Sequence, residues 1–150
     1  MYKTLTSLLD VISYMRGHKE LEGSLKGGCP WHMKLTLGHL KKYIQGESKE
    51  LVEAIENIER DENTGIVSPE KVENFKEELG DLLLQILVAT EIAQEKELFN
   101  LDDVFQRLEH KLRFRSPHLF EAVPFSSLQE IEKMWQERKV LEKKAITLLK

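Results

Sequence analysis

Apolar residues recur at helical spacing along most of the chain. Between residues 2 and 16 the apolar positions are separated by three or four residues, which places them on one face of a helix; they are Leu5, Leu8, Leu9, Ile12 and Met15. The same criterion predicts four further helices, over about residues 36–60, 69–97, 100–115 and 126 to the late 140s. The sequence therefore predicts an all-α fold, a helical bundle of about five helices.

Local signals mark the ends of these helices. Thr36 and Ser68 stand where N-cap residues are expected, and Pro69 follows at the first helical position. Residues 61–65 (Asp-Glu-Asn-Thr-Gly) read as a turn, and Pro117 ends the fourth helix. The glycine-rich segment 23–31 is predicted to be a loop.

Composition narrows the class of protein. A chain of 150 residues predicts a single domain over residues 1–150, and 4 prolines with 8 glycines leave few turns for an all-β fold. No apolar run approaches the ~20 residues of a membrane span, so no membrane association is expected. Cys29 is the one cysteine and the first residues lack a secretory segment, which together predict a cytoplasmic location. With a net charge of −4 and no broad basic surface, nucleic-acid binding is not expected.

Two closely spaced pairs of acids are the strongest chemical signal. Glu47 and Glu50 are three residues apart, and so are Glu78 and Asp81. Residues at this spacing share a helix face, so each pair can direct two carboxylates at one point. Glu47 lies on an apolar stripe, and Asp81 leads into the apolar run 82–89, which predicts a buried helix.

Acids that converge in apolar surroundings need an opposite charge nearby to stay ionised. Four carboxylates would repel one another and take up protons unless a cation lay between them. Oxygen ligands suit Mg²⁺, with Mn²⁺ as the second choice. We therefore predict a divalent metal site formed by four acids: Glu47, Glu50, Glu78 and Asp81.

Basic residues gather in the last third of the chain. Residues 45–81 carry a net charge of −8, whereas residues 107–150 carry +4. Lys111 and Arg115 are four apart at the end of a helix, where they either bind phosphate oxygens or stabilise the helix C-terminus. Trp135 and Lys139 repeat the spacing, and Trp135 is either a core anchor or the wall of a base pocket.

Several other chemistries lack their motifs. The chain has no G-x-x-x-x-G-K-[ST] phosphate loop, no G-x-G-x-x-G and no G-x-S-x-G elbow. It also has no E-x-x-H, which weakens the alternative of a di-metal redox carboxylate protein.

Five segments in this order resemble the MazG family of nucleoside triphosphate pyrophosphohydrolases. The first is Gly-Cys-Pro-Trp at 28–31, similar to the family's G-C-P-W-D. Residues 47–55 resemble E-E-x-x-E-x-x-x-A-I, residues 78–85 match E-L-G-D-L-L-x-Q, and residues 111–120 resemble K-L-x-x-R-H-P-H-V-F. The last segment is Trp135 with Lys139, similar to the closing W-x-x-x-K.

The resemblance implies a fold, a reaction and a set of site residues. It implies a MazG-like helical bundle that forms a homodimer or a higher homo-oligomer. The implied reaction is hydrolysis of a nucleoside triphosphate to the monophosphate and pyrophosphate. The furthest that the resemblance goes toward a physiological role is removal of non-standard nucleotides. It assigns metal binding to the four acids, with Glu77 or a member of the second pair accepting a proton. It assigns triphosphate and nucleotide binding to four further residues: Lys111, Arg115, Trp135 and Lys139.

The chain departs from the family pattern at four positions. The first Glu of E-E-x-x-E is Gly46, and the Asp after the tryptophan is His32. A family Gln is replaced by Leu35, and the first His of H-P-H is Ser116. These departures keep open an alternative, a helical interaction protein with a weakened or regulatory nucleotide site.

Overall fold

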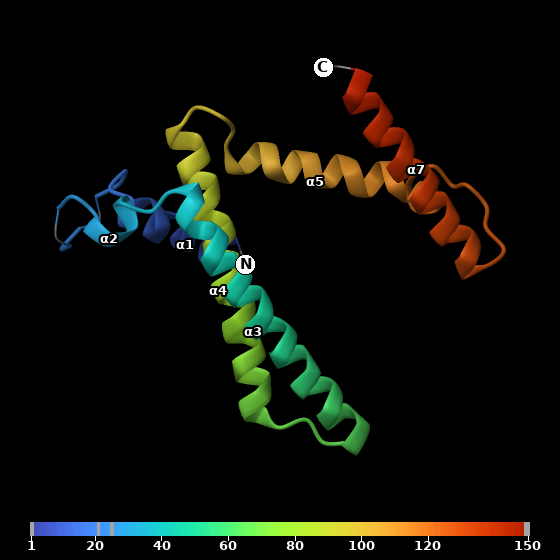
Figure 1. Ribbon diagram of the computed structural model, residues 1–150, viewed down its shortest axis with the longest axis horizontal. Coiled ribbons are helices and arrows are strands. Elements are labelled where there is room, and N and C mark those ends of the chain that lie inside the picture. The colour runs from blue at the N-terminus through green and yellow to red at the C-terminus, as the bar shows by residue number, and fades with distance from the viewer. Residues whose placement is uncertain (1, 21, 25, 149–150) are drawn as a thin grey trace. The chain divides into compact units, whose positions relative to one another are not determined.

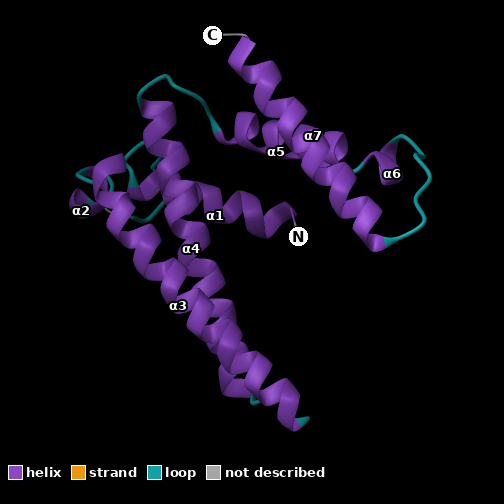
Figure 2. Ribbon diagram, turned by 45° about the vertical axis from the view of Figure 1, so that its right-hand side comes forward, coloured by secondary structure: helices purple, strands orange, loops and turns teal. Residues whose placement is uncertain are grey.

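The computed structural model describes residues 2–20, 22–24 and 26–148, and every regular element in them is a helix (Figures 1 and 2). The five predicted helices are α1 (Tyr2–Met15), α3 (Leu37–Thr64), α4 (Pro69–Glu95), α5 (Leu101–Arg115) and α7 (Leu128–Leu148). The sequence did not predict two single-turn helices, α2 (Pro30–Met33) and α6 (Pro117–Phe120). Both begin at a proline, whose fixed φ angle suits the first helical position. The all-α prediction is confirmed.

The chain divides into two compact units. The first is Met1–Leu101 and contains α1 to α4; the second is Asp102–Lys150 and contains nearly all of α5 with α6 and α7. The single domain over residues 1–150 and the cytoplasmic location both stay predictions from the sequence.

The core of the first unit forms where α1, α3 and α4 meet. Helices α3 and α4 lie side by side as a long hairpin, and α1 packs against α4 (Figures 1 and 2). Fully buried Ile12, Leu40 and Ile92 come one from each of these helices, so truncating any of them to Ala is expected to cost about 2–5 kcal/mol. The whole buried cluster is Ile12, Leu35, Leu40, Leu87, Val88 and Ile92.

A buried arginine connects the N-terminal segment to this core. The Nε atom of Arg16 donates to Oε1 of Glu95 at 2.7 Å, and a second guanidinium nitrogen bonds Oε2 of the same carboxylate. Its Nη1 atom donates to the carbonyl oxygens of His32 and Leu35. The Arg16 guanidinium holds the pKa of Glu95 below its usual value. One side chain therefore joins α1, the segment after α2 and the end of α4.

Both ends of α3 have identifiable caps. The His39 amide donates to Oγ1 of Thr36 at 3.4 Å, and the Thr36 amide donates to Nδ1 of His39 at 3.2 Å, a capping box with histidine in the acid's usual place. The helix continues to Thr64, so the turn predicted over residues 61–65 is mostly helical. It ends at Gly65, whose φ of 84° is the left-handed conformation that glycine adopts without strain.

An aspartate closes the hairpin between α3 and α4. The Ser68 amide donates to Oδ2 of Asp61 at 3.0 Å, and Lys71 bonds its Oδ1 atom. Ser68 is the N-cap of α4 as predicted, although its side chain makes no capping hydrogen bond. The hydrogen bond from Lys71 lowers the pKa of Asp61, so the ion pair fixes the tip of the hairpin.

One face of α4 stays open. Leu87 and Val88 in the apolar run 82–89 are buried as predicted, but Leu83 is 42% and Ile86 44% exposed. The prediction that the whole run is buried is therefore wrong, because neighbouring helices cover α4 on one side only. No helix in the described ranges is both long and apolar enough to cross a membrane.

Arginine–aromatic contacts hold the second unit together. The Arg138 guanidinium of α7 lies 4.9 Å from the Phe114 ring of α5, and Arg113 lies 4.9 Å from the Phe120 ring of α6. Arg138 also donates to Oε2 of Glu121 at 2.7 Å. Cation–π contacts of this kind contribute about 0.5–1 kcal/mol each at exposed sites, so this unit depends less on a buried apolar core than the first.

Candidate functional site

Three of the four predicted metal ligands converge between α3 and α4. Glu47 and Glu50 lie on α3 and Glu78 lies on α4, and each offers an oxygen within 4.8 Å of the others. Because α3 and α4 are antiparallel neighbours in the hairpin, the two short-spaced pairs come from opposite helices to one place. Glu47 and Glu78 are half-buried and Glu50 is exposed, so the cluster opens to solvent.

The fourth acid acts on the same cluster through its charge. Asp81 is half-buried on α4, one turn beyond Glu78. Its negative charge helps to raise the pKa of both Glu47 and Glu78. Glu77 is exposed beside Glu78, and its charge also raises the pKa of that carboxyl.

Two carboxyl groups of this cluster, those of Glu47 and Glu78, have a raised pKa. Desolvation is the largest cause of the raised pKa of Glu47, followed by repulsion from Asp81, Glu50 and Glu78. For Glu78 desolvation again comes first, followed by Glu50, Asp81 and Glu77. Repulsion among the acids, expected from their spacing, therefore acts on Glu47 and Glu78. The carboxylate oxygens of the cluster form a donor set that fits a divalent cation.

Two amide side chains near the cluster were missed by the sequence reasoning. Nδ2 of Asn74 donates to Oε1 of Glu78 at 3.3 Å, and the Gln85 side chain hydrogen-bonds Glu47. Both bonds favour the charged form of their carboxylate and oppose the repulsion. A signal was present, since Asn74 is four residues before Glu78 and Gln85 is four after Asp81 on the same helix.

A polar pocket lies beside Asn74, toward the tip of the hairpin. It has a volume of about 260 Å³ and lies between the two helices. Asn74, which bonds Glu78, is part of its wall. The complete lining is Ala54, Asn57, Ser68, Glu70, Lys71 and Asn74.

All the predicted phosphate-binding residues belong to the second unit, where Arg115 already has a counterion. Its Nε and Nη2 atoms donate to Oε2 of Glu142 on α7 at 2.9 and 2.7 Å. The guanidinium carbon lies 5.5 Å from the centroid of the Trp135 ring. The structure thus brings Arg115 and Trp135 together, and the hydrogen bonds from Arg115 lower the pKa of Glu142.

Lys111 and Lys139 are half-buried on α5 and α7. Lys111 is close enough to Glu142 for its charge to lower the pKa of that carboxyl, and Arg107 lies 3.3 Å from Oε1 of the same group. Glu142 was not predicted, although it is three residues after Lys139 and therefore on the same helix face.

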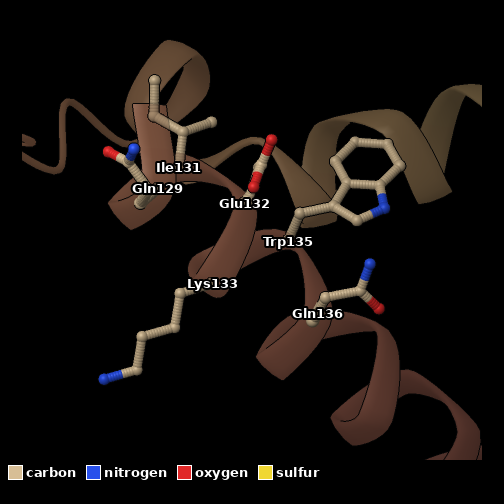
Figure 3. Close-up of a pocket in the computed structure, with 6 residues that line it drawn as sticks. All are labelled: Gln129, Ile131, Glu132, Lys133, Trp135 and Gln136. Carbon is tan, nitrogen blue, oxygen red and sulfur yellow. The ribbon is translucent and has the colours of Figure 1, made fainter. Parts of the chain in front are cut away.

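An open pocket of about 570 Å³ lies beside Trp135. Figure 3 shows that its lining comes from α7 alone, with the Lys133 side chain directed away from the indole. The half-buried tryptophan therefore has an accessible surface as well as its contact with Arg115. The lining residues are Gln129, Ile131, Glu132, Lys133, Trp135 and Gln136.

The four departures from the family pattern have different surroundings. A Cβ added at Gly46 would meet just one atom, Oε1 of Glu50 at 3.9 Å, so there is room for a side chain. Leu35 belongs to the buried core, and Ser116 is buried between α5 and α6. His32 has a buried Nδ1 atom without a hydrogen-bond partner among the described residues, and burial lowers its pKa.

Comparison with known proteins assigns the chain to a family. A model of the MazG nucleotide pyrophosphohydrolase domain matches residues 35–120, which include the acidic cluster and Arg115. The nucleoside triphosphate pyrophosphohydrolase/pyrophosphatase MazG of Thermotoga maritima is 38% identical over 77% of this chain and 39% of its own length. The nucleoside triphosphate pyrophosphohydrolase of Escherichia coli K12 is 29% identical over 79% of this chain and 40% of its own.

Two further relatives match a larger share of this chain or of their own length. The uncharacterized protein YabN of Bacillus subtilis is 31% identical over 95% of this chain but 25% of its own length, so the chain spans from a quarter to about two fifths of these three curated relatives. A crystal structure of a MazG-related protein from Thermotoga maritima aligns with a TM-score of 0.56 and 30% identity, covering 74% of this chain and 86% of that one. With the family model matching more than half of its length, the chain belongs to the MazG nucleotide pyrophosphohydrolase family.

Proposed function

We propose that the protein is a metal-dependent nucleoside triphosphate pyrophosphohydrolase, which converts NTP and water to NMP and pyrophosphate. The observation that carries this proposal is the convergence of Glu47, Glu50 and Glu78 within 4.8 Å, because like charges brought this close are disfavoured without a cation, the more so where two of the three are half-buried. The names of the relatives from Thermotoga maritima and Escherichia coli support the same reaction. Removal of non-standard nucleotides is the physiological role that we propose for it.

The donor set is all carboxylate oxygen, which fits Mg²⁺ or Mn²⁺. Glu47, Glu50, Glu78 and Asp81 would hold the ion. When bound, such an ion neutralises phosphate charge and lowers the pKa of a coordinated water. Asn74 and Gln85 orient two of these carboxylates through their hydrogen bonds.

The chain also offers a proton acceptor at the cluster. The attacking water must lose a proton as it bonds the α-phosphorus. Glu77 is exposed and adjacent to Glu78, and its carboxylate is the one acid of the predicted set that is not assigned to the metal. We assign the role of general base to Glu77.

Triphosphate binding is assigned to the second unit. Lys111, Arg115 and Lys139 supply positive charge for the β- and γ-phosphates and stabilise the departing pyrophosphate. Trp135 offers an aromatic face beside an open pocket, where the nucleotide base or ribose would pack.

A second copy of the chain is the partner that we propose for the open face of the hairpin. Leu79, Leu83 and Ile86 lie on one face of α4 and are 42–46% exposed; Val52 and Ile55 of α3 are 53% and 39% exposed. Two such hairpins, related by a two-fold axis, would bury these residues in a four-helix bundle. Light scattering should give the mass of a dimer, and Leu83→Glu should give a monomer; a monomeric wild-type chain would contradict this assembly.

One experiment separates the enzyme from the alternative, a regulatory interaction protein. Gly46, His32 and Leu35, which stand where the family pattern has other residues, favour that alternative. Pyrophosphate release should be measured over a panel of ribo- and deoxynucleoside triphosphates, with Mg²⁺, with Mn²⁺ and with a chelator. We expect release that depends on the metal; binding of nucleotides without any turnover would establish the regulatory protein instead.

A further inference from the structure

Glu142 is an unusual acid for its place in the molecule. Its side chain is 9% exposed, and it lies among three cations, Arg107, Lys111 and Arg115. Glu137 of the same helix has ordinary surface surroundings: it is 61% exposed and lies 3.9 Å from Lys133. A carboxylate buried at the centre of a basic cluster removes one of the charges that would attract a phosphate.

The geometry of the contact between Arg115 and Glu142 shows how the guanidinium is held. Both bonds from Arg115 to Glu142 come from one edge of the guanidinium, Nε at 2.9 Å and Nη2 at 2.7 Å. The guanidinium carbon lies 5.5 Å from the Trp135 ring centroid, and the arginine side chain is 13% exposed. Glu142 thus holds one edge of the group beside the Trp135 ring, while Nη1 is the nitrogen that Glu142 does not engage.

We propose that Glu142 is a positioning residue for Arg115. It holds the guanidinium over Trp135 with its Nη1 side presented to the outer phosphates of the substrate. A long arginine side chain loses much conformational freedom when it binds an anion, and that cost is reduced when its orientation is fixed beforehand. The inference rests on the proposed triphosphate site, and it adds a residue that acts through Arg115 without contacting the substrate.

Binding of inorganic triphosphate in excess Mg²⁺ tests this role independently of turnover and of the nucleotide base. Glu142→Gln keeps the size of the side chain and an oxygen that accepts a hydrogen bond, but it removes the charge. Charged hydrogen bonds contribute more than neutral ones, so we expect triphosphate affinity to fall about tenfold. Glu137→Gln removes the same charge from an exposed position of the same helix, and its affinity should stay within about twofold of the wild type.

A double-variant cycle separates positioning from general stabilisation of the second unit. If Glu142 acts through Arg115, the double variant that carries both Arg115→Ala and Glu142→Gln should bind triphosphate no more weakly than the single variant Arg115→Ala. In ¹⁵N spectra the Arg115 Nε–H signal, assigned by its loss in Arg115→Lys, should exchange slowly in the wild type and broaden in Glu142→Gln.

Three results would overturn the role: unchanged affinity in Glu142→Gln, tighter binding in it, or losses that multiply in the double variant. Tighter binding would show that the carboxylate competes with phosphate. Should Glu142→Gln not fold, Glu142→Asp is judged by the same criteria, since its shorter side chain keeps the charge but alters the two-bond contact. Normal triphosphate binding with no release of pyrophosphate from any nucleotide would refute the proposed reaction and leave the positioning role intact.

Discussion

The two units differ in how their charged side chains are arranged. In the first unit, Glu47, Glu50 and Glu78 converge with mainly like charges around them, and burial and repulsion raise the pKa of two of them. In the second unit, the basic cluster contains its own counterion, Glu142, whose pKa is lowered by the hydrogen bonds from Arg115. The acids of the first cluster therefore repel one another, whereas the cations of the second cluster have a carboxylate among them that pairs with Arg115.

The largest effect is expected from breaking the acidic cluster. Glu50→Gln and Asp81→Asn should each reduce turnover at least ~100-fold, because a neutral amide binds Mg²⁺ poorly and removes negative charge. The matched control is Glu56→Gln, an exposed acid on the same helix as Glu50, which should keep its activity. Steady-state kinetics and calorimetric metal titration measure the two effects. Full activity in a folded Glu50→Gln or Asp81→Asn protein would remove that residue from the site.

A smaller effect is expected from the basic cluster. Arg115→Ala should weaken NTP binding by roughly 10- to 150-fold, the equivalent of one charged contact of about 1.5–3 kcal/mol. Binding of NMP should weaken less, since it lacks the outer phosphates, and metal binding without nucleotide should hardly change. Arg113→Ala is the control for affinity: Arg113 lies on the same helix, pairs with the exposed Glu109 and contacts the Phe120 ring, so its loss should lower stability while NTP affinity stays unchanged. Unchanged NTP affinity with lowered thermal stability would instead make Arg115 a helix-end residue.

Metal should stabilise the first unit by relieving repulsion. Saturating Mg²⁺, at about a hundredfold excess over its Kd, contributes roughly 2.7 kcal/mol and should raise the Tm by several degrees. Glu78→Ala should reduce this gain and stabilise the metal-free protein. Differential scanning calorimetry with and without Mg²⁺ gives both quantities; a Tm indifferent to millimolar Mg²⁺ and Mn²⁺ would contradict a preformed site.

The contribution of the acidic cluster to the free energy of unfolding should depend on pH, and the raised pKa values give the direction of the change. Because the folded pKa of Glu47 and Glu78 is raised above 4.5, the folded metal-free protein binds more protons than the unfolded chain above that pH. Their contribution to the free energy of unfolding therefore falls as pH rises through the raised values. The stability of Glu78→Gln relative to wild type should grow over this window in chelator and shrink in Mg²⁺. A difference that is flat with pH would show that the two pKa values are ordinary.

The smallest effect concerns the helix that carries the first pair of acids. Gly46→Ala should stabilise the protein by up to about 1 kcal/mol, because glycine in a helix interior is unfavourable and an added Cβ meets one atom at 3.9 Å. Gly65→Ala should destabilise it, since φ there is 84°. Urea denaturation measures both. Turnover should change little in Gly46→Ala, so a large loss would mean that the backbone at this position, and not charge alone, controls the site.

Short-range patterns predicted most of the fold. The caps at Thr36 and Ser68 and the apolar stripes located the five long helices, because those features depend on neighbours within one or two turns. The end of α3 was placed too early, since Asp61 pairs with Lys71 across the hairpin and lets the helix continue to Thr64. Exposure of Leu83 and Ile86 depends on which helices cover α4, and spacing along one helix does not contain that information.

Spacing along each helix predicted three acids that the structure brings together, but not the side chains that hydrogen-bond them. Spacing placed Glu47 with Glu50 and Glu78 with Asp81, and the structure brings Glu47, Glu50 and Glu78 together. Metal and phosphate binding at these residues stay predictions. Arg115 and Glu142 are 27 residues apart in sequence and lie on different helices, so the spacing of residues along α7 does not reveal their contact.

Each unit contains one of the two tryptophans of the chain. Trp31 is 55% exposed and lies 6.0 Å from Tyr43, whereas Trp135 is half-buried against a guanidinium. Their emission spectra should therefore differ, with the Trp31 band at longer wavelength because water surrounds more of its ring. Replacing either one by phenylalanine leaves a single tryptophan, in the other unit, whose emission can be excited selectively above the tyrosine absorption. Metal and nucleotide titrations can then be followed optically in each half of the molecule without attaching a dye.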